Sequence, residues 1–205
     1  MLDASLSAQL QQLYRDLPVT IVLRQRPSDH AKQDELPTML ADIAATAPGK
    51  IVHRVEGETA AIPSFEVAIE GEGRTASILF KGIPGGHEFS SLVLAVLNAA
   101  GLGKRPDEGL QNRIRHLKGP VRLRTFVSLS CHNCPEVVQS LNLLAVLNPG
   151  VRTTMIDGAL FQAEVEERQI MAVPYVFLNG KEFSQGRISL EELSLIHISE
   201  PTRPY

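Results

Sequence analysis

The chain has 205 residues and 43% of them are hydrophobic, which is enough to bury the core of one large domain or of two small ones. Its formal net charge is −3, so no excess of basic residues points to nucleic acid or an anionic membrane as a partner. It has no tryptophan and few aromatic residues, so we do not expect nucleic-acid bases to stack on its side chains. The longest tight apolar run, residues 92–97, is far shorter than the roughly 20 residues of a membrane helix.

The N-terminus carries Asp3 and lacks an apolar core, so it does not resemble a secretory signal peptide. Two cysteines are too few for the disulfide framework of a secreted scaffold, and we expect a reducing, cytoplasmic location. Residues 194–205 resemble translated sequencing-adaptor read-through, and we expect them to be foreign to the fold. The alternative is a natural, poorly ordered tail.

Hydrophobic periodicity, together with proline and glycine stops, predicts the elements of the first half of the chain. They are a helix over 2–17, a strand over 19–23, a helix ending at residues 48–49, strands over 50–55, 63–71 and 75–80, and helices over 87–101 and 106–119.

The second half predicts the same order again. Its expected elements are a strand over 120–129, a cysteine-containing loop and a helix ending at residues 149–150, a strand over 151–157, a helix over 161–171, a hairpin over 174–186 and a helix from residue 188. The hairpin is indicated by Asn179-Gly180, a strong two-residue turn signal.

The two halves can be aligned as a diverged internal repeat. Pro18-Val19 matches Pro120-Val121 at an offset of 102, and Pro63 matches Pro174. At the offset of 102, residues 29–32 fall on Cys131–Cys134, so the first half has Asp29 and Lys32 where the second has cysteines. We expect two tandem βαβ…ββα units, residues 1–103 and 104–193, with Asp29 as a helix N-cap.

A strand, a Cys-x-x-Cys loop, a helix and then X-Pro before a hairpin resemble the thioredoxin fold. Two such units with cysteines only in the second resemble the N-terminal domain of the flavoprotein (F) subunit of bacterial alkyl hydroperoxide reductase. The runs "HEFSSLVLAVL", "SLSCHNCPEVVQSLNLLAVLNP" and "NGKEFSQGR" carry this resemblance, which covers residues 1–193. The expected fold class is α/β, with two tandem thioredoxin-like folds packed as one domain.

Cys131 and Cys134 are the only cysteines, and three kinds of site are open to such a pair. A structural disulfide closing so short a loop stabilises a protein by only about 2 kcal/mol. A zinc site needs four ligands, and the sequence has no second cysteine pair and no histidine pair at ligand spacing, so no metal is expected. Thiol–disulfide exchange fits best, because a thiol just before a helix is favoured as the thiolate.

In this interpretation Cys131 is the nucleophile that attacks a partner disulfide, and Cys134, one turn deeper, resolves the mixed disulfide. His132 and Asn133 lie between them and either tune the thiolate or are ordinary exposed loop residues.

Two further positions are predicted to belong to the site. Val173-Pro174 resembles the cis-proline that faces the cysteines in thioredoxin folds, and the Val173 backbone would then receive an incoming peptide as an added strand. Glu88 belongs to a His87-Glu88 pair that follows two glycines in the unit without cysteines. It is either a carboxylate favoured by a helix N-terminus or a group that exchanges protons with the cysteines across the gap between the units.

The resemblance implies an electron relay. A flavoprotein module that uses FAD and NAD(H) would reduce the cysteines, which would reduce the disulfide of a peroxiredoxin. The chain has no G-x-G-x-x-G after a strand, so we expect it to bind neither cofactor and to be a fragment, with both cofactors in the missing C-terminal part. The full-length protein would be a homodimer. The alternatives are a free-standing glutaredoxin-like disulfide oxidoreductase and a non-enzymatic interaction module.

Overall fold

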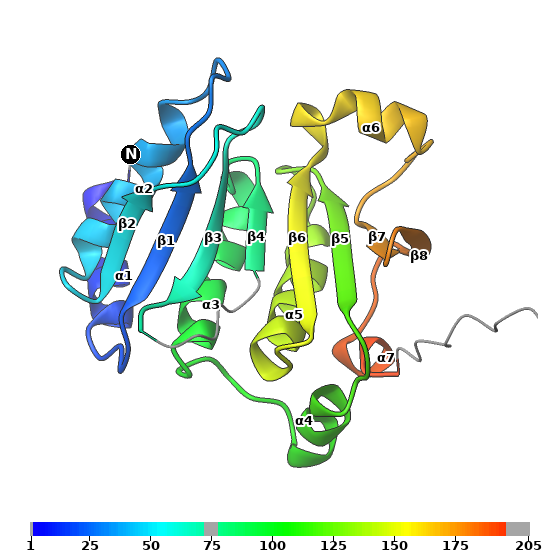
Figure 1. Ribbon diagram of the computed structural model, residues 1–205. Coiled ribbons are helices and arrows are strands. Elements are labelled where there is room, and N and C mark those ends of the chain that lie inside the picture. The colour runs from blue at the N-terminus through cyan, green and yellow to red at the C-terminus, as the bar shows by residue number, and fades with distance from the viewer. Residues whose placement is uncertain (1, 72–77, 196–205) are drawn as a thin grey trace, which may run out of the picture.

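The computed structural model describes residues 2–71 and 78–195 and contains one eight-stranded mixed sheet with the order β2-β1-β3-β4-β6-β5-β7-β8 (Figure 1). The strands are β1 (Ile21–Arg26), β2 (Ile51–Val55), β3 (Ser64–Ile69), β4 (Ile78–Lys81), β5 (Val121–Val127), β6 (Val151–Asp157), β7 (Tyr175–Leu178) and β8 (Lys181–Gln185). The helices are α1 (Ala4–Tyr14), α2 (Glu35–Thr46), α3 (Phe89–Ala99), α4 (Glu108–Arg115), α5 (Cys134–Leu147), α6 (Gln162–Glu167) and α7 (Leu190–Leu193), with short 3-10 helices η1 (Gly86–Glu88) and η2 (Gly158–Leu160).

The sheet consists of two halves with the same pairing pattern. In each half the first strand runs parallel to the second and antiparallel to the third, and the third pairs antiparallel with the fourth. The predicted tandem thioredoxin-like units are therefore confirmed. The sequence did not predict the parallel pairing of β4 with β6, which joins the halves into one sheet. This joint removes two sheet edges whose backbone groups would otherwise remain unpaired.

The alignment of the two halves at an offset of 102 was wrong. In the sheet Ile21 pairs with Ile51 and Val121 pairs with Val151, so equivalent strand positions are 100 residues apart. Pro18 lies three residues before β1 whereas Pro120 lies directly before β5, and this difference misled the alignment. By contrast, Pro63 and Pro174 both lie directly before their strands, as expected.

The corrected alignment changes which residues of the first half correspond to the cysteines. Helix α2 begins at Glu35 and α5 at Cys134, so Lys32 corresponds to Cys131 when residues are counted from the helix starts. The N-cap of α2 is Asp34, not Asp29 as predicted, and its side chain makes no capping hydrogen bond.

Element boundaries differ from the predictions at several ends. The first strand begins at Ile21 and ends at Arg26, later than predicted, and α6 stops at Glu167 rather than near residue 171. Residues 75–77 of the predicted fourth strand lie outside the described residues. The hairpin of β7 and β8 is confirmed, with positive φ angles at Asn179 (49°) and Gly180 (85°).

In the described ranges, no helix combines the length and the apolar character needed to cross a membrane.

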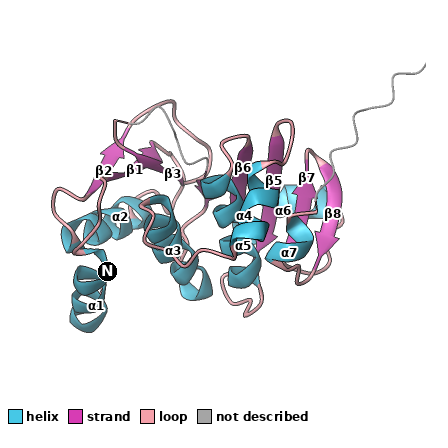
Figure 2. Ribbon diagram, turned by 90° about the horizontal axis from the view of Figure 1, so that it is seen from below, coloured by secondary structure: helices cyan, strands magenta, loops and turns pink. Residues whose placement is uncertain are grey.

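The two faces of the sheet are covered differently. Successive strand residues point to opposite faces, and in β5 Leu123 and Val127 belong to the large core whereas Phe126 belongs to a small one. Helices α1, α2, α3 and α5 lie along one side of the strands (Figure 2). The small core is completed by Phe161 and Val165 at α6, so α6 covers only part of the second face.

Helix α5 positions the cysteines at the end of β5. It begins at Cys134 with Pro135 in its first turn, where the missing N–H of proline costs no helical hydrogen bond. Its buried residues include Val137, Leu141 and Leu144, which fix the helix against the sheet. The first turn of α5 is therefore held rigidly beside the loop that carries Cys131.

Candidate redox site

Cys131 and Cys134 form a disulfide at the N-terminal end of α5, with their Cα atoms 5.5 Å apart. Cys134 is fully buried, whereas Cys131 is only partly buried. The loop before the helix is tightened by a hydrogen bond of 2.9 Å that the Cys131 N–H donates to the Ser128 carbonyl oxygen. An outside thiolate or disulfide can thus approach Cys131 without displacing the helix, but not Cys134.

The Val173–Pro174 segment lies directly against this disulfide. The peptide bond between the two residues is cis. Cys131 Sγ is 3.8 Å from the Val173 carbonyl oxygen, a contact rather than a hydrogen bond because a disulfide sulfur carries no hydrogen. Pro174 is held in turn by its carbonyl oxygen, which accepts a 2.8 Å hydrogen bond from the Gly186 N–H. The structure therefore brings together Cys131 and Val173, as the sequence predicted.

The two residues between the cysteines are exposed and face different neighbours. The His132 ring lies 4.2 Å from the His87 ring, centroid to centroid. Asn133 Oδ1 accepts a 3.0 Å hydrogen bond from Arg187 Nε, which also lies 3.6 Å from a Glu136 carboxylate oxygen. In the part of the chain that the structure describes, no three His, Cys, Asp or Glu side chains are grouped as metal ligands.

Arg187 was missed by the sequence reasoning. It is the last residue of the run "NGKEFSQGR", and its position in that run gave no hint that it contacts the loop between the cysteines. The contact depends on how the hairpin of β7 and β8 returns to the start of α5, which local sequence patterns do not specify.

The first half of the chain contributes one wall of the site. The His87 N–H donates a 3.0 Å hydrogen bond to the Leu129 carbonyl oxygen, two residues before Cys131. Gln139 Nε2 on α5 donates a 3.1 Å hydrogen bond to Ser90 Oγ on α3. The segment from η1 into α3 is therefore fastened to the cysteine loop and to α5.

Glu88 lies in this same segment and is fully buried. One carboxylate oxygen, Oε2, accepts a 2.6 Å hydrogen bond from Ser91 Oγ, and the other, Oε1, is buried without a hydrogen-bond partner among the described residues. Burial raises the pKa of the Glu88 carboxyl to about 7, and the Ser91 hydrogen bond offsets this only in part. Neither oxygen is hydrogen-bonded to a cysteine, and the hydrogen bond from the neighbouring His87 to Leu129 ties the Glu88 segment to the cysteine loop.

Glu88→Gln is expected to stabilise the protein at pH 8 and to have little effect at pH 4. The pKa of Glu88 is raised from 4.5 to about 7 in the folded state, so ionising this carboxyl costs more free energy folded than unfolded. The native protein therefore loses stability as the pH rises through this range, by on the order of 3 kcal/mol in total. Urea unfolding of both proteins across pH 4 to 8 measures the difference.

The matched control for this prediction is Glu58→Gln, which removes an exposed carboxylate. It should not reproduce the difference between pH 4 and pH 8 that is expected for Glu88→Gln. A Glu88→Gln effect of the same size at every pH would show that Glu88 is not held in its neutral form by burial.

Comparisons with known proteins agree with this geometry. The family model described as "Thioredoxin domain" matches residues 122–196. The alkyl hydroperoxide reductase F subunit of Pseudomonas putida is 46% identical over 193 residues, which are 94% of this chain and 36% of that protein. The chain thus spans about a third of the length of the curated relatives that it matches.

Two solved structures share the fold. The NTD_N/C domain of alkylhydroperoxide reductase AhpF from Enterococcus faecalis has a TM-score of 0.87 and 30% identity, and the match covers 95% of this chain and 98% of that one. A protein disulfide oxidoreductase from Aeropyrum pernix has a TM-score of 0.80 over 95% of this chain and 92% of its own, at 18% identity, which shows the fold alone. The chain belongs to the family of alkyl hydroperoxide reductase F subunits and corresponds to their N-terminal domain.

Proposed function

We propose that this chain is the disulfide relay of a peroxiredoxin reductase. It accepts two electrons from a flavoprotein module and passes them to the disulfide of a peroxiredoxin. The observation that carries the proposal is the pairing of a partly exposed Cys131 with a fully buried Cys134 at the start of α5. The family relationship supports it, because the relatives are named as subunits of alkyl hydroperoxide reductase.

The proposed exchange has two steps. In the reduced protein the Cys131 thiolate attacks a sulfur of the partner disulfide, a mixed disulfide forms, and the other partner sulfur leaves as a thiolate. Cys134, deprotonated, then attacks Cys131 Sγ, which restores the Cys131–Cys134 disulfide and releases the second partner thiolate. Two electrons pass to the partner, and both released thiolates take up protons. The buried position of Cys134 keeps it from reacting first with an outside disulfide.

The Val173 backbone is proposed to hold the incoming partner segment. It borders Cys131 and precedes β7, so a peptide that pairs with it as an added strand would bring its disulfide to Cys131. His132 and Asn133 would contact the same segment, because both are exposed beside Cys131.

The binding sites for the two cofactors are proposed to lie outside this chain. FAD and NAD(H) would be bound by the remainder of the full-length protein, which would be a cytoplasmic homodimer. Within this chain, residues 1–103 would form a first unit that serves as scaffold and docking surface, and residues 104–193 the reactive unit. The repeated strand order supports this division, and the expectation for the tail falls mostly on residues 196–205, outside the described residues.

Glu88 is proposed to supply and accept protons for the exchange. Its pKa of about 7 suits proton transfer near neutral pH, and its segment adjoins the cysteine loop through the hydrogen bond from His87 to Leu129. In Glu88→Gln, exchange with a small disulfide should slow about tenfold or more and lose its dependence on pH near 7. An unchanged rate and pH profile would leave Glu88 with a structural role.

Redox cycling of the purified chain tests the proposal itself. The disulfide should be reduced by dithiothreitol to two titratable thiols. It should re-form when the dithiothreitol is removed and bis(2-hydroxyethyl) disulfide is added. The Cys131→Ser/Cys134→Ser chain is the control and should show neither change. A disulfide that resists reduction in the folded chain would favour a purely structural bridge or a non-enzymatic module.

A further inference from the structure

A hollow of about 510 Å³ lies on the sheet face that α6 leaves uncovered. Its lining residues come from β1, β3, β4, β5 and β6, with Glu56 just after β2, so it spans the joint where β4 pairs with β6. None of its lining residues belongs to the cysteine loop or to the Val173–Pro174 segment. The hollow is therefore separate from the disulfide site.

Basic side chains dominate this hollow. Six of the twenty Lys and Arg residues of a chain with a net charge of −3 line it, against two carboxylates. The six are Arg24, Arg26, Lys81, Arg122, Arg124 and Arg152. They are brought together because every second residue of neighbouring strands points to the same face. Concentrating cations in one hollow of an otherwise acidic chain creates a local positive potential.

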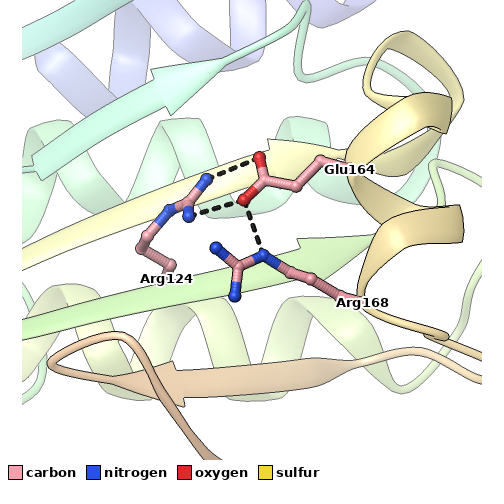
Figure 3. Close-up of polar contacts among 3 residues, drawn as sticks. All are labelled: Arg124, Glu164 and Arg168. Atoms are coloured by element: carbon pink, nitrogen blue, oxygen red, sulfur yellow. Dashed lines mark hydrogen bonds and ion pairs between the residues drawn. The ribbon is translucent and has the colours of Figure 1, made fainter.

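The cations at two ends of the hollow are already paired. Arg24 Nε lies 3.2 Å from a Glu56 carboxylate oxygen. At the other end Arg124 donates two hydrogen bonds, of 2.7 and 2.8 Å, to the two carboxylate oxygens of Glu164, which also accepts one from Arg168 (Figure 3). These pairs fix the guanidinium groups of Arg24 and Arg124 against the sheet.

The remaining four cations are not paired in this way. Among the residues that the structure describes, Arg26, Lys81, Arg122 and Arg152 have no carboxylate within ion-pair distance. Glu66 lies among them, and burial raises the pKa of its carboxyl while the nearby Arg24, Arg152 and Arg26 lower it. Glu66 makes no ion pair with any of these cations among the described residues, and its single carboxylate can offset only part of their combined positive charge.

We propose that this hollow binds a small molecule with two or more phosphate or carboxylate groups. The volume is in the range of small-ligand sites. Arg side chains with free guanidinium groups bind such anions by paired, charge-assisted hydrogen bonds. The backbone of the joined strands supplies a rigid floor, and Leu79 supplies an apolar part of the lining. The Glu56 and Glu66 carboxylates oppose a long, uniformly charged polyanion, which favours a compact ligand.

Isothermal titration of the 205-residue chain with inorganic pyrophosphate tests this site. We expect saturable binding of one pyrophosphate per chain, which Arg26→Gln/Arg152→Gln weakens at least tenfold. Lys50→Gln/Arg115→Gln is the matched control, because it removes the same charge from two exposed cations that do not line the hollow. It should change the dissociation constant less than twofold.

Glu66→Gln distinguishes binding in the hollow from a loss of binding that a variant causes only by disturbing the fold. Removing this carboxylate takes away a repulsive charge, so pyrophosphate should bind several-fold more tightly. Absence of saturable binding, equal losses in both double variants, or weaker binding by Glu66→Gln would each overturn the proposal. Tighter binding of a hexaglutamate peptide than of pyrophosphate would also overturn it and point to an acidic polypeptide as the ligand. None of these outcomes depends on cysteine exchange.

Discussion

Cys134→Ser is expected to accumulate a stable mixed disulfide with an oxidised peroxiredoxin, whereas Cys131→Ser is expected to form none. In Cys134→Ser the partly exposed Cys131 can still attack, but no second thiol remains to resolve the mixed disulfide, so the mixed disulfide accumulates. In Cys131→Ser the remaining thiol is fully buried at the start of α5 and cannot reach an outside disulfide. Disulfide reduction by Cys131→Ser should fall on the order of 10³-fold.

Non-reducing electrophoresis and intact mass spectrometry measure the trapped complex. The Cys131→Ser/Cys134→Ser chain serves as the blank. Alkylation of the reduced wild-type chain with iodoacetamide should label Cys131 before Cys134. If Cys131→Ser traps the complex instead, the assignment of the attacking and resolving thiols must be reversed.

Gly86→Ala is expected to destabilise the protein strongly at the junction of the two halves. Gly86 has φ +54°, and a Cβ built there would lie 2.5 Å from the Leu129 carbonyl oxygen, which is backbone and cannot move aside alone. The same oxygen accepts the hydrogen bond from His87. Positive φ adds about 1–2 kcal/mol of strain, and we expect a total of about 3 kcal/mol.

Gly49→Ala is the matched control for this prediction. Its φ is +75°, and nothing lies within 4 Å of a Cβ built there, so it reports the backbone strain alone. Urea unfolding should show a larger loss for Gly86→Ala, and the alkylation rate of reduced Cys131 should change only in that variant. Equal losses for the two variants would mean that the contact between Gly86 and Leu129 does not hold the cysteine loop.

Much of this architecture could be predicted from local patterns. The cysteine spacing before Pro135, the Asn179-Gly180 turn and the prolines before β3 and β7 each have a physical reason to occur where they do, and the structure places all of them as expected. The tandem units followed from the order of these signals along the chain. The sequence therefore indicated both the fold and the residues at the disulfide.

The features that were missed depend on contacts between distant segments. The pairing of β4 with β6 joins the edges of two units, and no residue of Ile78–Lys81 signals which strand will lie beside it. The basic hollow spans that pairing, which brings Lys81 of β4 to the same hollow as Arg124 of β5 and Arg152 of β6. The misaligned repeat arose because Pro18-Val19 looked equivalent to Pro120-Val121, although only strand register shows which positions correspond.

Rapid-quench thiol counting during a single transfer tests the relay most directly. The chain is reduced with dithiothreitol, freed of reductant and mixed with an equal amount of a peroxiredoxin carrying its disulfide, and both proteins are then alkylated and weighed. We predict that each chain loses two thiols, at Cys131 and Cys134, while each reduced peroxiredoxin disulfide gains two. A chain that keeps both thiols while the peroxiredoxin stays oxidised would contradict the account.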